Sequence, residues 1–243
     1  MRRPRHPVLA LLALLALAAC SRGDAVSPLE LEVVKAARAA IAAGPASKTP
    51  TPALTRAVLD TIDGALLEVT LERRNQRAYL YVNAQRRDGG PGKVVTWRTG
   101  DDITLAMRNG VLIATRGLGG DILSATVQVA GDRPGPARGG EKSFDIRALD
   151  HKARRLTLTC TLSDLGPATI EIIDRTYATR HIRETCEGGV AGYSIGYSIG
   201  AGTGAPGRVV NDYWVDAGAG LVWQSRQWAG PQTGYLRMRR VIR

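Results

Sequence analysis

Histidine and cysteine are scarce in this chain, and their scarcity limits the chemistry that it can carry. The 243 residues include three histidines and three cysteines. A metal site draws on several such side chains at close spacing. Once the N-terminal segment described below is set aside, His151 and His181 are the remaining histidines, and neither has ligand spacing to a cysteine. The sequence therefore predicts neither a metal site nor a cofactor.

Long apolar runs are lacking after the first twenty residues, so no later segment is expected to cross a membrane as a helix. The N-terminus itself begins with three arginines and continues with an uncharged apolar run over residues 8–19. A run of this length is too short for a stable membrane span and is typical of a signal peptide.

The apolar run ends in Leu17-Ala18-Ala19-Cys20, the small-residue pattern that a lipoprotein signal peptidase recognises. We therefore expect residues 1–19 to be removed as a lipoprotein signal peptide and Cys20 to be acylated. An N-terminal cysteine with more than one acyl chain gives stable anchoring. Ser21, in place of an aspartate, favours sorting to the outer membrane. The alternative is an ordinary secretory signal with an incidental cysteine.

The rest of the chain is predicted to be a short tether, residues 20–27, and a single domain over residues 28–243. Removing residues 1–19 takes away three arginines and no acid, which leaves 30 basic and 22 acidic residues and a net charge of +8. Outside the cytoplasm, this charge favours acidic glycans, lipopolysaccharide phosphates or an anionic membrane surface as partners rather than nucleic acid. The alternative is a basic surface that only keeps the protein soluble.

Lipidation of Cys20 leaves Cys160 and Cys186 as the remaining cysteines. An even pair in an oxidising compartment predicts a disulfide bond between them.

Two segments near the N-terminus have helix-start signals, residues 28–43 and residues 51–62, and the pattern then changes to alternation of apolar and polar residues. Asn109-Gly110 is the clearest hairpin signal. The sequence thus predicts a mainly β protein, an antiparallel sandwich or open barrel of about ten strands with one or two short N-terminal helices. The expected strands begin at Leu66 and cover residues 78–84, 94–98, 103–108, 111–115, 122–130, 143–149, 154–162, 168–175 and 178–186, with three more in residues 209–242.

Two glycine-rich stretches resemble the sequence patterns of known functional sites. The stretch TRGLGGDIL at residues 115–123 resembles a phosphate cradle, but a strand rather than a helix is expected after it, so a nucleotide role is not predicted. A weaker anion contact through Arg116 remains open. The repeat GYSIGYSIG at residues 192–200 matches the nucleophile-elbow pattern twice, but no histidine follows it in the chain. The carboxylates show no paired spacing either, and we predict that the protein is not an enzyme.

Aromatic residues are few, and they concentrate near the C-terminus. Of the 12 Phe, Trp and Tyr residues, five lie within residues 211–235. Aromatic planes beside amides and arginine are typical of carbohydrate sites. The alternative is that these rings fill the core, since the chain has a single Phe. The candidate contacts for a glycan or a protein partner are Arg116, Asp212, Tyr213, Trp214, Trp223, Gln224, Arg226 and Trp228.

A family resemblance rests on several of these blocks together: LAAC, then WRTGDDITLAMRNGVLIATRGLGGDILSA, then the cysteine pair, then NDYWVDAGAGLVWQSRQWAGPQTGYLRM. In this combination the chain resembles the YjbF/GfcB family of lipoproteins, from about Leu66 to Ile242. The resemblance implies an outer-membrane lipoprotein encoded beside exopolysaccharide or capsule genes, with a mostly antiparallel β fold. The family has no established catalytic residues to carry over.

The predicted function is that of a periplasm-facing outer-membrane lipoprotein that assists production or export of an extracellular polysaccharide without catalysis. It would bind an acidic polysaccharide or a protein of the export machinery. Two alternatives remain open. A carrier of lipid or lipopolysaccharide would need an apolar cavity, and a glycan-modifying enzyme would need two carboxylates in a cleft.

Overall fold

The computed structural model describes residues 54–147, 151–188 and 207–242, and these residues all belong to one compact unit. Several sequence features lie outside the described residues: the signal peptide, Cys20, the tether, the expected helix at residues 28–43 and the GYSIGYSIG repeat. The lipid attachment and the domain boundaries therefore stay predictions.

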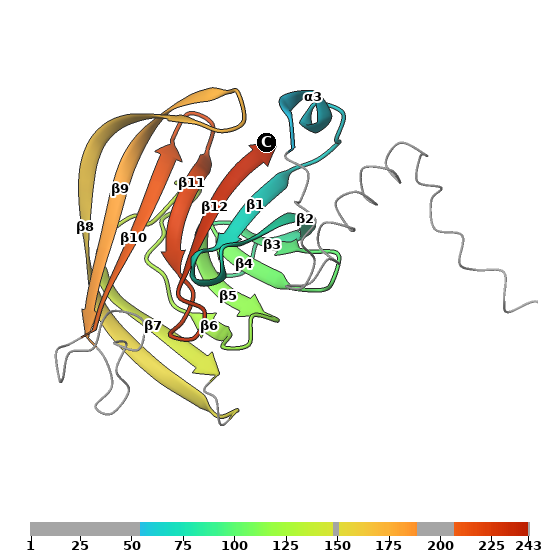
Figure 1. Ribbon diagram of the computed structural model, residues 1–243. Coiled ribbons are helices and arrows are strands. Elements are labelled where there is room, and N and C mark those ends of the chain that lie inside the picture. The colour runs from blue at the N-terminus through green and yellow to red at the C-terminus, as the bar shows by residue number, and fades with distance from the viewer. Residues whose placement is uncertain (1–53, 148–150, 189–206, 243) are drawn as a thin grey trace, which may run out of the picture. The chain divides into compact units, whose positions relative to one another are not determined.

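One antiparallel sheet of twelve strands forms the described part of the chain, in the order β5-β4-β3-β2-β1-β12-β11-β10-β9-β8-β7-β6 (Figure 1). The mainly β prediction is confirmed, with twelve strands instead of about ten. The helical elements in this part are α3 (Arg56–Leu59) and the 3-10 turn η2 (Glu72–Arg74). The strands are β1 (Leu66–Leu71), β2 (Gln76–Arg86), β3 (Val94–Arg98), β4 (Thr104–Arg108), β5 (Val111–Arg116), β6 (Ile122–Ala125), β7 (Gly140–Arg147), β8 (Ala153–Glu171), β9 (Thr176–Gly188), β10 (Gly207–Asp216), β11 (Leu221–Trp228) and β12 (Tyr235–Ile242).

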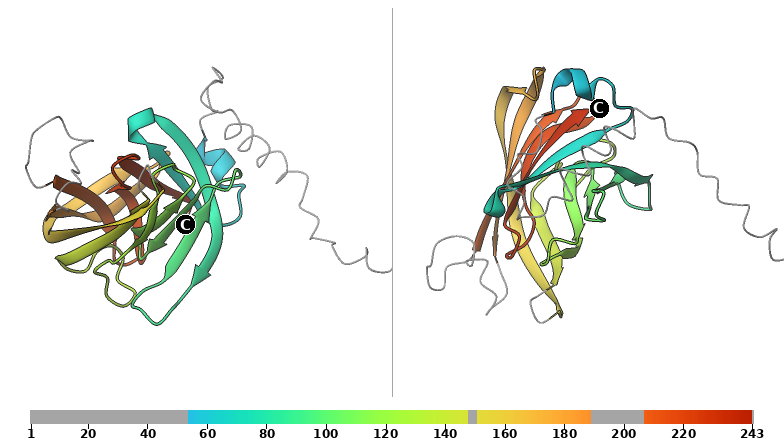
Figure 2. Two further views of the ribbon diagram at one scale, coloured as in Figure 1. Left: turned by 90° about the horizontal axis from the view of Figure 1, so that it is seen from below. Right: turned by 45° about the vertical axis from the view of Figure 1, so that its right-hand side comes forward.

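The sheet curls until its two end strands, β5 and β6, come together (Figure 2). At this seam the backbone N–H of Ile122 donates to Thr115 Oγ1 over 3.0 Å. Gln227 of β11 adds a second closure, because its side chain accepts from Leu112 N and donates to Gly110 O, both at 2.8 Å. Between β5 and β6, side-chain hydrogen bonds thus take the place of part of the backbone hydrogen bonding that would join two paired strands. The sheet is therefore a nearly closed barrel.

The longest strand corrects the sequence prediction of two separate strands over residues 154–162 and 168–175. Gly166 and Pro167 are residue types that usually interrupt a strand. β8 nevertheless continues through them, and its pairing with β9 shifts register between Asp164 and Pro167. A bulge of this kind absorbs extra residues without ending the pairing. The strand expected over residues 122–130 is shorter than predicted and ends at Ala125.

Apolar side chains from nearly every strand fill the interior, including Leu80, Ile146, Leu156 and Met238, all almost fully buried. A second apolar cluster closes one end of the barrel, where Leu59 of α3 packs with Ile172, Trp223 and Val241. The helix itself is a single turn of four residues, capped by Thr55, rather than the longer element predicted over residues 51–62.

Candidate functional site

The outer surface of β9 to β12 carries two cross-strand rows of polar and aromatic side chains. In the first row, Arg183, Asp212, Arg226 and Arg237 lie opposite one another across four strands. In the second row, the neighbours are His181, Trp214, Gln224 and Arg239. Residues directly opposite in an antiparallel pair have side chains in contact range on one face. We call these eight residues the arginine face.

Asp212 holds one side of the arginine face in place. Its Oδ1 lies 2.7 Å from His181 Nε2 and accepts a hydrogen bond from Arg183 Nε over 2.8 Å. The His181 ring stacks on Trp214 with centroids 4.5 Å apart and planes 10° apart. The result is a fixed aromatic plane beside a guanidinium group, with Trp214 half-buried.

Two carboxylates hold two of the other arginines, Arg226 and Arg239. Arg226 binds Glu72, with Nη2 2.8 Å from Oε2, and its guanidinium lies 3.6 Å from the centroid of the Tyr235 ring. Burial alone would lower the pKa of Arg226, but the hydrogen bond and charge of Glu72 raise it above the ordinary value. Arg239 binds Glu68 in the same way.

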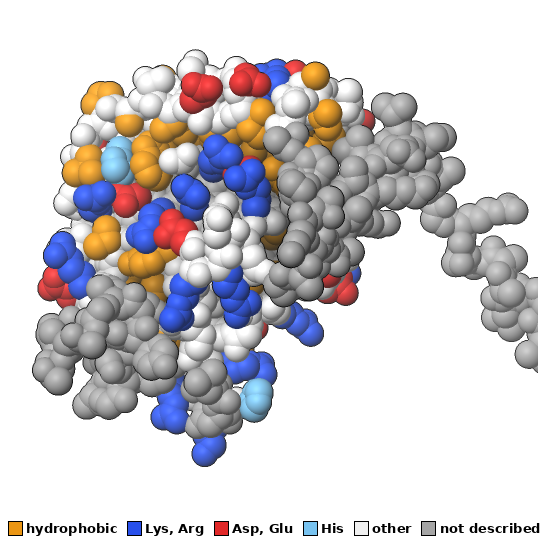
Figure 3. All heavy atoms as spheres, in the orientation of Figure 1, with side chains coloured by type: hydrophobic (Ala, Val, Ile, Leu, Met, Phe, Trp, Pro, Cys, Tyr) orange, Lys and Arg blue, Asp and Glu red, His pale blue; other side chains and the backbone are white. Residues whose placement is uncertain are grey.

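Arg237 completes the arginine face as its exposed cation. Within the described parts of the chain, its guanidinium has no hydrogen-bond or ion-pair partner. Figure 3 shows Lys and Arg side chains gathered over the middle of this surface, with few Asp and Glu side chains among them.

The structure divides the predicted contact residues. It brings Asp212, Trp214, Gln224 and Arg226 together on the arginine face. Arg116 is exposed at the end of β5 and does not join them.

Three other candidates are largely buried and do not belong to the arginine face. Tyr213 is 0 % exposed, Trp228 is 3 % exposed and Trp223 is 6 % exposed. Trp228 packs edge-on against Phe144 with centroids 5.3 Å apart. A polymer outside the barrel cannot reach the Tyr213 and Trp228 rings, so the alternative interpretation, that aromatic rings fill the core, describes these two residues.

Arg237 and Arg239 were not among the contacts predicted from the sequence, although a signal was present. They alternate with the apolar Leu236 and Met238, which is the pattern of a strand with one basic face. His181 and Arg183 alternate with Ile182 in the same manner. That all four residues share a surface with Trp214 depends on the register between the strands, and the alternation of residues along one strand does not determine this register.

A buried polar network lies inside the barrel, beneath the arginine face. Glu184 Oε2 accepts from Lys142 Nζ over 2.9 Å and from Asn211 Nδ2 over 2.7 Å. Tyr213 Oη also donates to it over 3.4 Å. Burial by itself would raise the pKa of Glu184, but the Lys142 ammonium and these hydrogen bonds hold it below the ordinary value. Burial and the neighbouring Glu184 carboxylate raise the pKa of Tyr213 well above the ordinary value.

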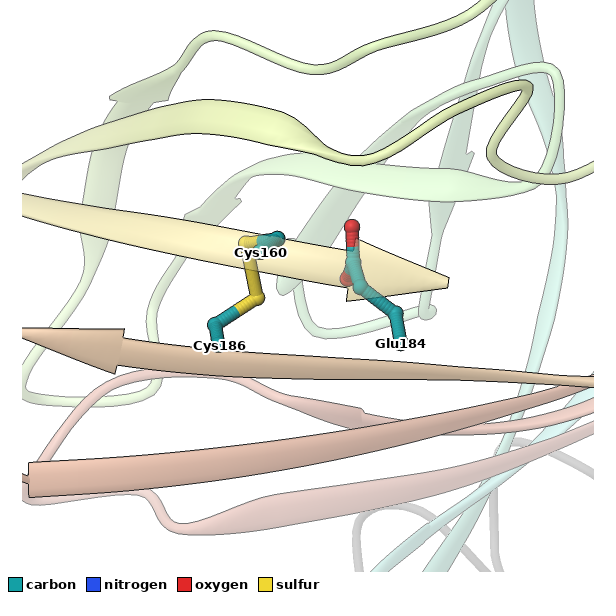
Figure 4. A group of neighbouring side chains, drawn as sticks. All are labelled: Cys160, Glu184 and Cys186. Atoms are coloured by element: carbon teal, nitrogen blue, oxygen red, sulfur yellow. A yellow bond between two sulfur atoms is a disulfide. The ribbon is translucent and has the colours of Figure 1, made fainter. Parts of the chain in front are cut away.

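The predicted disulfide is confirmed, because Cys160 of β8 and Cys186 of β9 are bonded. With Glu184 they make the one group of three possible metal-ligand side chains at close range in the described residues (Figure 4). Both sulfurs are in the disulfide and the carboxylate is paired with Lys142, so this group does not offer a cation site.

A cavity of about 260 Å³ reaches the interior beside Trp97, Met107, Met238 and Arg240. Typical small-molecule sites have volumes of about 300–1,000 Å³. Its volume thus falls just below that range. None of the helices among the described residues is long and apolar enough to cross a membrane.

Comparison with known proteins supports the same fold and assigns the family. A family model described as "Group 4 capsule polysaccharide lipoprotein gfcB, YjbF" matches residues 33–241. The crystal structure of the hypothetical lipoprotein YmcC from Escherichia coli (K12) is similar, with a TM-score of 0.63 and 18% sequence identity over 91% of this chain and 98% of that chain. At this identity the likeness concerns the fold alone. The search of curated proteins returned no match.

The family match covers most of the chain, including the cysteine pair and all strands that form the arginine face. It agrees with the resemblance noted in the glycine- and tryptophan-rich blocks. The chain therefore belongs to the YjbF/GfcB family of group 4 capsule polysaccharide lipoproteins.

Proposed function

We propose that this protein is an outer-membrane lipoprotein, facing the periplasm, that binds an acidic polysaccharide and assists its production or export without catalysis. The observation that carries the proposal is the arginine face, in which four arginines share one surface with the stacked His181–Trp214 pair. The family description, which names capsule polysaccharide, supports the choice of ligand.

The chemistry of the arginine face suits an acidic glycan. Guanidinium groups form forked, charge-assisted hydrogen bonds to carboxylates and phosphates. The Trp214 ring offers an apolar plane for the C–H face of a sugar, and the Gln224 amide offers a donor and an acceptor for hydroxyl groups. Arg237, which is exposed and unpaired in the described structure, is free to meet an acidic group of the polymer.

Removing the key groups of the arginine face should weaken binding of purified acidic polysaccharide. We expect Arg237→Gln or Trp214→Ala to lower affinity about 3- to 10-fold at low ionic strength, since exposed charge and aromatic contacts contribute about 0.5–1.5 kcal/mol each. The affinity of the unaltered protein should fall as salt rises, and Arg237→Gln should reduce that salt dependence. Both quantities are accessible by titration calorimetry.

Arg87→Gln is a matched control, because Arg87 is 61 % exposed and pairs with Asp132 in a region away from the arginine face. Equal losses in Arg87→Gln and Arg237→Gln would contradict the proposal, because they would indicate attraction by net charge alone.

The lipid anchor is tested in cells. In a strain that lacks this gene, we expect released polysaccharide to fall and the unaltered gene to restore it. Cys20→Ala, which removes the acylation site, should not restore it. Unchanged polymer in both the released and the cell-retained fractions would refute the assignment to polysaccharide export.

Two rival functions give different results in these tests. An accessory that contacts only an export protein would support release in cells but bind no purified polysaccharide. A lipid or lipopolysaccharide carrier would co-purify with lipid. The 260 Å³ volume of the interior cavity does not favour a carrier of whole lipids.

A further inference from the structure

A second cleft lies at one end of the barrel, where α3, the β8–β9 turn and the end of β12 meet (Figure 1). The site is a cleft of about 660 Å³, within the size range of small-molecule sites. Its lining includes Arg56, Asp60, Asp174, Arg175, Tyr177 and Trp223. We call it the end cleft.

Two stacked aromatic rings are part of the lining of the end cleft. The Tyr177 and Trp223 centroids are 3.9 Å apart and their planes are 30° apart. The Trp223 indole N–H donates to Asp216 Oδ2 over 3.1 Å, which fixes the orientation of the ring. The Tyr177 hydroxyl has no hydrogen-bond partner in the described structure. The cleft thus contains a rigid apolar plane with a free hydroxyl group at its edge.

The charges around the end cleft balance. Its two arginines, Arg56 and Arg175, face two carboxylates, Asp60 and Asp174. Arg175 Nη2 lies 3.0 Å from Asp60 Oδ1, so these two neutralise each other. The Asp174 carboxylate has no partner among the described residues and is a free acceptor. A site with equal charges and both donors and acceptors suits an uncharged, hydroxyl-rich ligand better than an anion.

An unusual backbone conformation places Asp174 at the cleft. Ile173 and Asp174 have φ angles of 43° and 60°, and a left-handed conformation is rare for a β-branched residue such as isoleucine. Arg56 stabilises this turn by donating from Nε and Nη2 to Ile173 O over 3.0 and 2.9 Å. Such strain persists where surrounding contacts impose it, and it is concentrated at functional sites.

From these observations we propose that the end cleft binds a single uncharged sugar ring. The ring packs on the Tyr177–Trp223 pair, and its hydroxyl groups donate hydrogen bonds to the Asp174 carboxylate. The aromatic pair supplies a plane for the C–H face, and the carboxylate and the Tyr177 hydroxyl fix the orientation. The end cleft and the arginine face are separate residue sets, so either proposal can fail without the other.

Saturation-transfer NMR tests the end cleft directly. The probes are neutral oligosaccharides of glucose, galactose and mannose, added to the mature lipidated protein in a detergent whose head group is not a sugar. We expect at least one of them to receive saturation from the aromatic protons, with an affinity that 0.5 M salt leaves unchanged within about twofold. Binding of an acidic polysaccharide to the arginine face would instead weaken with salt, and the variants below distinguish the two sites for a neutral sugar.

Three variants assign the signal to the cleft. Tyr177→Leu should lower the affinity about tenfold or more, because it removes the stacking plane. Asp174→Asn should lower it about fivefold, and Tyr177→Phe, which keeps the ring, should lose less than Tyr177→Leu. Glu141→Gln is the control for Asp174→Asn, since Glu141 is an exposed carboxylate on β7 outside the cleft.

The proposal is overturned if none of the oligosaccharides binds, or if Asp174→Asn and Tyr177→Leu bind as well as the unaltered protein. Asp174→Asn keeps this test valid if Tyr177→Leu fails to fold, because Asp174 is exposed and outside the apolar clusters.

Discussion

Lys142→Met is expected to lower the free energy of unfolding by about 3–5 kcal/mol near neutral pH. The Lys142 and Glu184 side chains are only 5 % and 4 % exposed, and their charged atoms lie 2.9 Å apart. Methionine keeps much of the lysine volume but leaves the Glu184 carboxylate buried without its cation. Removing one partner of a buried ion pair costs far more than the pair contributes, because a lone charge stays in a medium of low polarity.

The effect of Lys142→Met should depend on pH in a specific direction. In the unaltered protein the pKa of Glu184 is held below its ordinary value. That carboxylate therefore contributes stability above its unfolded pKa, near 4.5, which is lost as pH falls through the folded value. In the variant, burial is no longer opposed by Lys142, so we expect the pKa of Glu184 to rise and a neutral carboxyl group to be favoured. A raised pKa stabilises at low pH and loses that contribution as pH rises. The difference between the two proteins should therefore narrow from about pH 7.5 to about pH 5, as measured by urea unfolding.

A double variant provides the control. Glu184→Gln removes the charge but keeps an oxygen that accepts from Asn211 and Tyr213. The double variant Lys142→Met/Glu184→Gln should thus be more stable than Lys142→Met alone and should lose the unusual pH dependence. If the single and double variants unfold alike at all pH values, the buried carboxylate is not the source of the instability.

Replacing both cysteines, as Cys160→Ala/Cys186→Ala, is the second change with a large expected effect, a loss of about 2–5 kcal/mol in unfolding free energy. The disulfide joins residues 26 apart in the chain and restricts the unfolded state, which accounts for about 3–4 kcal/mol in the chain-entropy account. Both residues lie in the core, at 5 % and 0 % exposure, so lost packing adds to the effect. Thermal unfolding followed by circular dichroism measures the loss.

Treatment with a reductant distinguishes the stability that the disulfide bond contributes from the stability that packing of the two sulfur atoms contributes. Dithiothreitol should lower the melting temperature of the unaltered protein and leave that of Cys160→Ala/Cys186→Ala unchanged. If full reduction left the melting temperature of the unaltered protein unchanged, the disulfide bond would contribute no stability beyond the packing of its sulfur atoms.

Local sequence signals predicted the hairpins well. At Asn109-Gly110, both residues have positive φ angles, 49° and 85°, as the favoured two-residue hairpin turn requires. The glycine–proline signal misled the prediction at residues 166–167, where the pairing of β8 with β9 on both sides of the bulge kept one strand intact. Long-range pairing therefore overrode a local break signal.

The candidate site was predicted only in part, for a related reason. Regular alternation along β11 would place Gln224, Arg226 and Trp228 on one face and Trp223, Ser225 and Gln227 on the other. Gln224 and Arg226 follow this pattern, since both are less buried than Trp223, Ser225 and Gln227. Trp228, the last residue of the strand, does not follow it, because its ring packs against Phe144 inside the barrel. The side chain of the last residue of a strand can turn toward the core. The alternation of residues along the strand does not predict this orientation.

The sequence by itself determined the β class, the pairing of two cysteines and the membership of a lipoprotein family, because alternation, turn residues and cysteine number are local or compositional properties. The tertiary structure alone decided which charges are buried and which are exposed. Lys142 and Glu184 are 42 residues apart and read as ordinary surface charges, yet they form an ion pair inside the barrel. Arg183, Arg226 and Arg237 come from three strands, and they share one face because cross-strand hydrogen bonding aligned their registers.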